Sequence, residues 1–590
     1  METAQLAPLG VCILPEPRPN AARTVSYPHY THEILRHAGL CYTEIATEDL
    51  AAALPGLRLL LTAGDAELPA GLQARLAAWV EGGGRWLAVG GTGGAAGLFG
   101  VAPEAPAYGS FGGGASTLGE GYLAVAVQHR ILGHLARPLH YFNGLPAQVT
   151  DAQVLAGVLD AHQRLTQRVA VTEKRVGRGG CLLIAPDIPG TVVRIQQGVG
   201  VNRDGVSAPD GTAPVGDNVL KSSDGGVLDW IFDRQPVPGV PGLQGFFEPI
   251  ADHWRELLLR AIFYLAEQAE VSLPLLWLYP RSLPGLAHLS HDTDQNEPAK
   301  GERLLEVVAE AGIESTWCVI LPGYDAALLE RIRAAGHELA MHYDSMSDNC
   351  PWRADLFHEQ WEALTALFGG QEPLTNKNHY LRWEGDVDLW QWCVDHGIQL
   401  DQSKGASKTG EAGFNFGTCR PYFPVDFAGR TLDVLELPTP TQDFIVFAPP
   451  AILDPMLDAV VRSHGILHLL FHPAHIDKPG VADAILHAVD AAQAQGLEWW
   501  TAARINRWER ARRQVTWRDY TQDGRGAQVT LHAGAGLEGA TVLWLGRAGR
   551  GSVDGAAVDA STVTRWGFPF QAATFDAAPG SATRLAFQTS

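Results

Sequence analysis

Residues 286–294 read Leu-Ala-His-Leu-Ser-His-Asp-Thr-Asp, a largely apolar run that ends in two aspartates. A run of this kind predicts a buried strand. Side chains two residues apart on a strand project to the same side, so Asp292 and Asp294 can face one site together. Two carboxylates so close repel each other, and a bound cation relieves the repulsion. A solvated, aspartate-rich turn is the alternative interpretation of so short a motif.

Helical and strand patterns alternate after this motif. The apolar spacing predicts, in order, a helix over 301–311, a strand over 315–320, a helix over 326–335 and a further strand over 337–344. This order requires parallel strands, and the carboxyl ends of such strands gather at one face of a barrel, where active sites lie. We therefore expect Asp294 and His342 to share that face.

Histidines recur at later predicted strand ends. His379 lies in Asn-His-Tyr-Leu-Arg-Trp, residues 378–383, whereas His468 and His472 lie in Ile-Leu-His-Leu-Leu-Phe-His-Pro, residues 466–473. Any one histidine is more often a hydrogen-bonded core or surface residue than a ligand. Their recurrence at strand ends in one region favours a common site.

Seven motifs of this region occur in the order of a known family: SHDTD, GIESTW, AAGHELAMHYDS, NHYLRW, GIQLDQS, GTCRPYFP and LHLLFHP. Residues 276–510 resemble the polysaccharide deacetylase domain (NodB homology, carbohydrate esterase family 4), in a branch whose first motif reads HDxD. The resemblance implies a distorted (β/α)7 barrel around one divalent metal ion, for which zinc is the expected species.

The resemblance also implies roles, carried over position by position. Asp292 matches the general base, while Asp294 and His342 match metal ligands. His472 matches the catalytic histidine, which would protonate the leaving amine. Asp401 falls near the aspartate of the fourth motif and would orient that histidine.

One metal ligand of the family pattern is missing. The family's second metal histidine lies four residues after the first, where this chain has Met346, and a thioether is a poor ligand for a hard divalent ion. His379, at the next predicted strand end, is our candidate for the third ligand. It would complete an Asp-His-His set with open positions for water and substrate.

Substrate-binding residues are expected beside this group. Lys377 falls near the arginine of the third motif, and we expect it to bind substrate together with Tyr380 and Trp383. Tyr380, Trp383 and Trp390 could form a wall for a sugar ring. Burial in the barrel shell is the alternative for each of these rings.

We predict that the protein is a metal-dependent hydrolase. It would remove N-acetyl or O-acetyl groups from a glycan or amino sugar, and it would belong to the hydrolases that act on C–N bonds other than peptide bonds. Amide hydrolysis needs an activated water, a group that polarises the carbonyl and an acid for the leaving amine, and the residues above can supply all three. Two alternatives stay open: a catalytically lapsed carbohydrate-binding or scaffolding protein that keeps the barrel, and hydrolysis or deamination of a small cyclic amide.

Before the barrel, the pattern of residues 1–275 predicts a doubly wound α/β domain. A strand over 57–62, a helix over 72–80 and a strand over 85–90 form a βαβ unit. This stretch resembles the class I glutamine amidotransferase-like fold. The resemblance is to a noncatalytic version of that fold, because the turn over 88–92 holds no cysteine that could act as the nucleophile. Residues 196–247, rich in Gly, Pro, Asp and Ser, predict an irregular insertion in this domain.

Short alternating segments in residues 511–590 predict antiparallel strands and a small β-sandwich. A carbohydrate-binding module and a packing module are equally open. With 590 residues, the chain is too long for one core and is expected to form these three domains.

The balance of 44 Lys and Arg against 65 Asp and Glu gives a net charge of −21, which is the wrong sign for binding nucleic acid. The seven cysteines include no CxxC pair, so neither a disulfide framework nor a cysteine zinc site is indicated. No stretch approaches the roughly 18 apolar residues of a membrane span. Without an export signal the chain as written is expected to be cytoplasmic, or extracytoplasmic if a leader is missing. The sequence indicates no oligomeric state.

Overall fold

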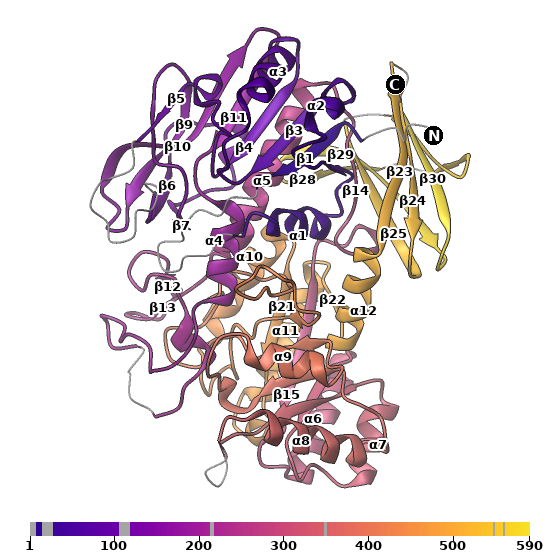
Figure 1. Ribbon diagram of the computed structural model, residues 1–590. Helices are drawn as coiled ribbons and strands as arrows, with labels where there is room; N and C mark the ends of the chain where they lie inside the picture. Colours follow the sequence, from indigo (N-terminus) through magenta and orange to yellow (C-terminus); the bar gives the residue numbers. More distant parts are fainter. Residues whose placement is uncertain are drawn as a thin grey trace. The chain divides into compact units, whose positions relative to one another are not determined.

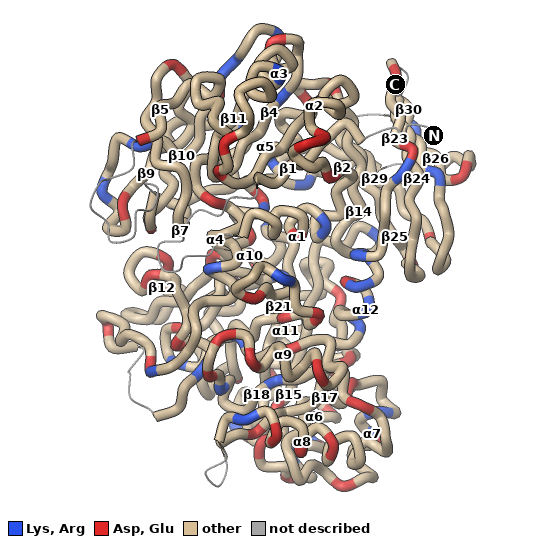
Figure 2. Tube along the Cα trace, viewed as in Figure 1, with Lys and Arg blue, Asp and Glu red and all other residues tan. Residues whose placement is uncertain are grey.

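The computed structural model describes residues 7–14, 27–104, 118–212, 218–346, 351–524, 526–546, 549–558 and 561–589. The protein is a mixed α/β chain of two compact units (Figure 1). Unit 1 comprises residues 1–193, 253–282 and 510–590, and unit 2 comprises residues 194–252 and 283–509. Acidic and basic residues are interspersed along the trace of both units (Figure 2). Among the described residues, no helix is both long and apolar enough to span a membrane.

Unit 2 is built on a parallel sheet in the order β20-β19-β18-β17-β16-β15-β21, and β22 also pairs with β15. The strands are β15 Leu286–Asp292, β16 Thr316–Val319, β17 Glu338–Tyr343, β18 Thr375–Asn378, β19 Leu400–Asp401, β20 Leu435–Glu436, β21 Ile466–Leu470 and β22 Glu498–Trp499. The apolar run Leu286–Asp292 is thus an interior strand of this sheet, paired with β16 and β21, and it is buried along its whole length.

This sheet is curled into a half-barrel. Two strands separate β15 from β18, which in a flat sheet would place them about 14 Å apart. Nevertheless, Lys377 Nζ on β18 lies 2.5 Å from Ser290 Oγ on β15. A side chain also connects β21 with the segment that follows β20, since His468 Nδ1 lies 2.8 Å from the carbonyl oxygen of Pro438. The carboxyl ends of the parallel strands therefore converge on a common region.

Helices connect and cover these strands: α6 Pro298–Ala311, α7 Ala326–Ala334, α8 Ala354–Leu367, α9 Asp388–Asp395, α10 Leu453–Ser463, α11 Val481–Ala494 and α12 Ala502–Arg513. The helices expected over 301–311 and 326–335 correspond to α6 and α7. Helix α7 begins where Asp325 Oδ1 accepts a hydrogen bond from the Leu328 N–H at 2.9 Å. Helix α6 ends at Gly312, whose φ of 66° suits glycine.

Residues 194–252 belong to unit 2, although we expected residues 196–247 to be an insertion of the first domain. They include the short pair β12 Gln235–Pro236 and β13 Gln244–Gly245. Val201, Val237 and Phe247 from this segment are buried in the same apolar core as the curled sheet. Burial of such scattered apolar residues, rather than regular periodicity, holds the segment in unit 2. Helices α4 Ile188–Gln197 and α5 Ile250–Gln268 flank it.

Unit 1 contains a mixed sheet in the order β2-β1-β3-β4-β11-β10-β9-β6-β7, parallel from β2 to β11 and antiparallel beyond. Its strands are β1 Leu9–Ile13, β2 Thr43–Glu44, β3 Leu59–Ala63, β4 Arg85–Val89, β6 Glu120–Val125, β7 Leu139–Phe142, β9 Gln153–Asp160, β10 Leu165–Val176 and β11 Gly179–Ile184. The predicted βαβ unit corresponds to β3, α3 Ala70–Glu81 and β4.

Strands β5 Val101–Pro103 and β8 Ala147–Val149 form a two-stranded antiparallel sheet in unit 1. The other strands of unit 1 form antiparallel sheets in the orders β14-β25-β29-β28 and β23-β24-β30-β26-β27. They are β14 Pro274–Leu276, β23 Val515–Asp523, β24 Gly526–Ala533, β25 Leu537–Leu545, β26 Gly549–Val553, β27 Ala556–Val558, β28 Ser561–Arg565, β29 Phe568–Ala577 and β30 Ala582–Thr589. Trp544 on β25 and Phe587 on β30 stack with ring centroids 6.2 Å apart. Strand β14 pairs with β25. One strand from before the half-barrel in the sequence therefore joins a sheet whose other strands all follow the half-barrel.

Candidate metal centre

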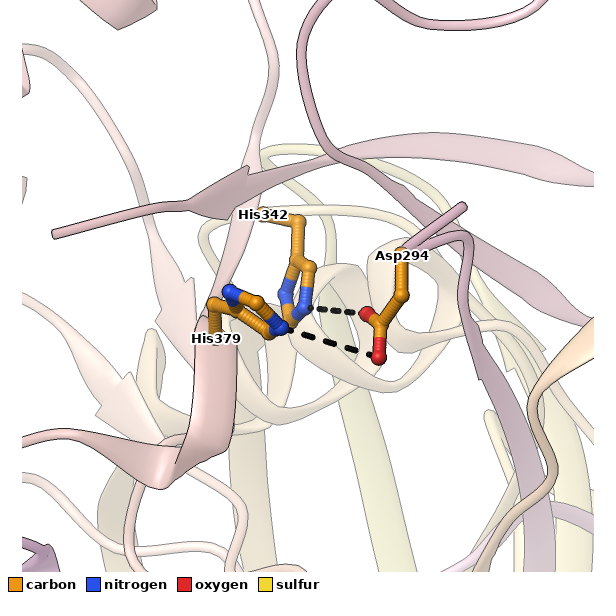
Figure 3. A group of neighbouring side chains, drawn as sticks. All are labelled: Asp294, His342 and His379. Carbon is orange, nitrogen blue, oxygen red and sulfur yellow. Dashed lines mark hydrogen bonds and ion pairs between the residues drawn. The ribbon is translucent and has the colours of Figure 1, made fainter. Parts of the chain in front are cut away.

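Three of the predicted site residues lie together at the carboxyl ends of neighbouring strands. Asp294 follows β15, His342 lies on β17, and His379 directly follows β18. Both imidazole rings point at the carboxylate of Asp294 (Figure 3). His342 Nε2 lies 3.2 Å from Asp294 Oδ1, and His379 Nε2 lies 3.6 Å from Asp294 Oδ2. One atom from each residue falls within 4.8 Å of the others, a spacing that can hold a metal ion.

The other ring nitrogen of each histidine is held by an oxygen. His342 Nδ1 lies 2.8 Å from the carbonyl oxygen of Lys377, and His379 Nδ1 lies 3.0 Å from Asp344 Oδ1. Oxygen acceptors require the hydrogen on Nδ1, so in the neutral rings both Nε2 lone pairs face Asp294. Lone pairs that face a carboxylate are stabilised by a cation between them. The donor set therefore fits a divalent metal, with Nδ1 anchors of the kind that orient metal-bound histidines.

The charges of these groups are coupled. Burial alone would raise the pKa of Asp294, but the neighbouring imidazoles of His342 and His379 outweigh burial and hold that pKa below its usual range. Burial alone would lower the pKa of His379, but the carboxylates of Asp294 and Asp344 outweigh it and raise that pKa to about 9. The cluster thus favours positive charge beside Asp294.

Met346, at the position of the absent family histidine, has another contact. Arg382 Nη1 lies 3.9 Å from Met346 Sδ, and the same guanidinium donates to the carbonyl oxygen of Ser345. Asp344, which anchors His379, was not predicted from the sequence. Its spacing of two residues from His342, the same spacing that relates Asp292 to Asp294, is the signal that could have identified it.

Asp292, the expected general base, is buried at the edge of this cluster. Its Oδ2 lies 3.8 Å from His342 Nε2, and its Oδ1 lies 3.4 Å from Lys377 Nζ. We expected Lys377 to bind substrate, and the structure corrects this, because its side chain has no exposed surface. Lys377 instead supplies a buried positive charge directly against Asp292.

His472, the expected catalytic histidine, also lies beside Asp294. Its Nε2 is 3.6 Å from Asp294 Oδ2, and its Nδ1 is 2.5 Å from Asp443 Oδ2. Burial alone would lower the pKa of His472, but Asp443 outweighs it and raises that pKa to about 9. His472 therefore presents Nε2 to the cluster, while Asp443 holds the opposite side of its ring.

Asp401, expected to orient His472, is engaged elsewhere. Its Oδ1 accepts hydrogen bonds from Asn376 Nδ2 and Ser403 Oγ, both at 2.8 Å, and burial raises its pKa. Asp443, not Asp401, contacts the ring of His472, and the sequence did not predict this residue. It lies in an irregular segment after β20 that matches no motif, so nothing in its local sequence distinguishes it from other aspartates.

The aromatic residues expected to form a wall differ in exposure. Tyr380 is 54% exposed, and its ring centroid lies 4.7 Å from that of His379. Trp383 and Trp390 are buried and pack edge to face, which rules out the expected contact of Trp383 with substrate. Phe447, which was not predicted from the sequence, is 55% exposed, and its ring centroid lies 6.3 Å from that of His472. Exposed rings thus lie beside two of the site histidines.

No family model matches the chain, and no curated protein matches it. Solved structures are similar to part of it. The "putative polysaccharide deacetylase from Mycobacterium smegmatis" has 18% identity and a TM-score of 0.32 over 42% of this chain and 96% of its own. The "probable Polysaccharide deacetylase from Pseudomonas aeruginosa PAO1" has 14% identity and a TM-score of 0.29 over 39% and 92%. "Puue Allantoinase" has 15% identity and a TM-score of 0.28 over 39% and 91%.

Proposed function

We propose that unit 2 is a metal-dependent hydrolase that removes N-acetyl or O-acetyl groups from a glycan or amino sugar. The observation that carries the proposal is the convergence of His342 Nε2 and His379 Nε2 on Asp294, with both Nδ1 atoms already held by oxygen acceptors. One carboxylate and two imidazoles suit zinc and leave positions for water and substrate. When bound, the metal supplies polarisation of the substrate carbonyl and a lowered pKa of water.

Asp292 is placed to act as the general base. Its carboxylate is buried beside the cluster and is balanced by the Lys377 ammonium at 3.4 Å. In this position Asp292 Oδ2 accepts the proton of the attacking water. Lys377 limits the cost of burying the Asp292 carboxylate, because it places an opposite charge directly beside it.

His472 is placed to act as the general acid. Its Nε2 lies within 4.0 Å of both Asp292 and Asp294, whereas its Nδ1 is held by Asp443. The ring can therefore deliver a proton from Nε2 to the leaving amine or alcohol without reorienting. Tyr380, exposed beside His379, offers its face to a sugar ring.

For unit 1 we propose noncatalytic roles. In the amidotransferase-like interpretation the nucleophile occupies the tight turn after β4, and here that turn begins at Gly90 with φ of 73°. A glycine offers no nucleophile. The two antiparallel sheets to which residues 511–589 contribute all strands but β14 are proposed to form a β-sandwich that acts as a carbohydrate-binding or packing module.

The test measures metal and acetate together. The purified chain is analysed for bound metals and then assayed for acetate release from chitooligosaccharides and a chromogenic acetyl ester, with a small cyclic amide as the comparison substrate. We expect about one zinc or similar ion per chain, and acetate release that a chelator abolishes and added zinc restores. Asp294→Asn should lose both properties. Absence of metal and of acetate release across the panel would favour a lapsed binding protein.

A further inference from the structure

A chain of polar side chains runs through the buried interior of the half-barrel beneath Asp292. Lys377 Nζ lies 2.5 Å from Ser290 Oγ, and Ser290 Oγ lies 2.9 Å from His468 Nε2. His468 Nδ1 lies 2.8 Å from the carbonyl oxygen of Pro438. Lys377, Ser290 and His468 are each at most 1% exposed. Such groups are costly to bury unless their hydrogen bonds are satisfied, so their arrangement is closely constrained.

The Pro438 carbonyl, at one end of this row of hydrogen bonds, determines which group donates in each of them. The Pro438 carbonyl can only accept, so His468 carries its hydrogen on Nδ1. Burial lowers the pKa of His468 well below its usual value, which leaves Nε2 as an acceptor for the Ser290 hydroxyl hydrogen. Ser290 Oγ then accepts from Lys377. The nitrogen of the same ammonium lies 3.4 Å from Asp292 Oδ1, which makes the two an ion pair.

We propose that Ser290 and His468 are positioning residues that hold the Lys377 ammonium against Asp292; this inference rests on the proposed function. A lysine ammonium is a point charge on a flexible stem with freely rotating donors, so it needs a fixed acceptor to keep one place. Ser290 provides that acceptor, and it lies two residues before Asp292 on the same side of β15. His468 keeps the Ser290 hydroxyl turned away from the ammonium.

A second buried histidine offers a matched control. His288 on β15 is the register partner of His468 on β21, and their ring centroids lie 4.6 Å apart. His288 Nδ1 lies 2.9 Å from the carbonyl oxygen of Trp500, and its Nε2 lies 2.8 Å from Gln402 Nε2. It thus resembles His468 in burial and in its carbonyl acceptor, but its hydrogen bonds lead to Gln402 rather than to Lys377.

The kinetic test compares Ser290→Ala, Ser290→Thr, His468→Leu and His288→Leu. With an acetyl ester and saturating zinc, Ser290→Ala and His468→Leu should lower kcat by about 10- to 100-fold, the usual cost of losing a supporting partner, with KM and metal content unchanged. Ser290→Thr, which keeps the hydroxyl, should recover most of the lost kcat. His288→Leu should lower Tm about as much as His468→Leu but keep kcat. If His468→Leu does not fold, the comparison of kcat between Ser290→Ala and Ser290→Thr tests the proposal instead.

A second measurement does not depend on activity. Nitrogen-15 NMR of lysine side chains should show a slowly exchanging Lys377 ammonium in the native chain and in His288→Leu, and rapid exchange in Ser290→Ala and His468→Leu. Equal protection in all four proteins would overturn the proposal, and so would equal kcat in His468→Leu and His288→Leu. If the native chain hydrolyses nothing, the proposed function fails, while the NMR comparison still decides whether Ser290 and His468 hold Lys377.

Discussion

Asp443 Oδ2 lies 2.5 Å from His472 Nδ1, although 29 residues separate the two in the chain. The Oδ1 atom of the same carboxylate accepts the backbone N–H of His472 at 2.8 Å and lies 3.1 Å from His475 Nδ1. His472 is therefore held at its ring and at its backbone by one buried side chain. This double contact fixes the direction in which Nε2 faces the metal cluster.

Asp443→Asn should lower kcat by at least about 100-fold, the lower end of what a positioned acid or base contributes. The amide cannot accept strongly from the ring and the backbone at once, so His472 loses both its orientation and its charge partner. The measurement is kcat for acetyl ester hydrolysis, with Tm recorded to separate a folding defect from a catalytic one.

Asp401→Asn is the matched comparison, because Asp401 is equally buried but bonds to Asn376 and Ser403. We expect a lower Tm and a kcat close to that of the native chain for the folded fraction. A loss of kcat as large as that of Asp443→Asn would restore Asp401 to the role that the sequence suggested.

His379→Ala should lower the bound metal from about one ion per chain to well below that value, because only Asp294 and His342 would remain of the proposed set. Met346→Leu is the control, since the Met346 sulfur lies against Arg382. Metal analysis after dialysis measures both variants. Unchanged metal in His379→Ala would remove His379 from the site, and loss of metal in Met346→Leu would make Met346 a ligand.

Tyr380→Ala should raise KM for an oligosaccharide substrate by about 5-fold, since an aromatic stacking contact is worth about 1 kcal/mol. Its kcat should change little, because the ring lies beside the cluster rather than within it. Trp383→Ala should instead lower the free energy of unfolding by about 3–5 kcal/mol, the usual cost of emptying a buried aromatic position. Steady-state kinetics and chemical denaturation measure the two effects, and the reverse pattern would exchange the two roles.

The free energy of unfolding should fall as the pH drops from about 6.5 to about 4. Burial lowers the pKa of His337 to about 4, and its Nδ1 accepts a hydrogen bond from the Ser315 N–H at 3.0 Å. Between the two pKa values the unfolded chain binds the extra proton, so acid favours unfolding by up to about 1.4 kcal/mol per pH unit. His337→Asn, which keeps an acceptor for Ser315, should flatten this slope.

Denaturation curves across this pH range measure the effect. His487→Asn, at an exposed position of α11, is the control and should leave the slope as it is in the native chain. An unchanged slope in His337→Asn would show that other groups govern the acid instability.

The main features of unit 2 could be predicted from local pattern. An apolar run followed by a DxD motif predicts one strand with Asp292 and Asp294 on the same side, and the convergence of parallel strand ends predicts that His342, His379 and His472 lie near them. These are short-range rules of backbone geometry. They hold whatever surrounds the strand, and the structure brings all five residues together.

Burial and long-range pairing could not be predicted in this way. Whether Lys377 and Trp383 face a substrate or the interior depends on the curl of the sheet. The curl brings into contact side chains from strands that are not neighbours in the sheet. The choice of Asp443 over Asp401 depends on the path of an irregular segment that carries no periodic signal. The sequence alone therefore determined which residues can reach the site, and the tertiary structure decided which of them touch, because contacts between distant segments follow from packing rather than from local pattern.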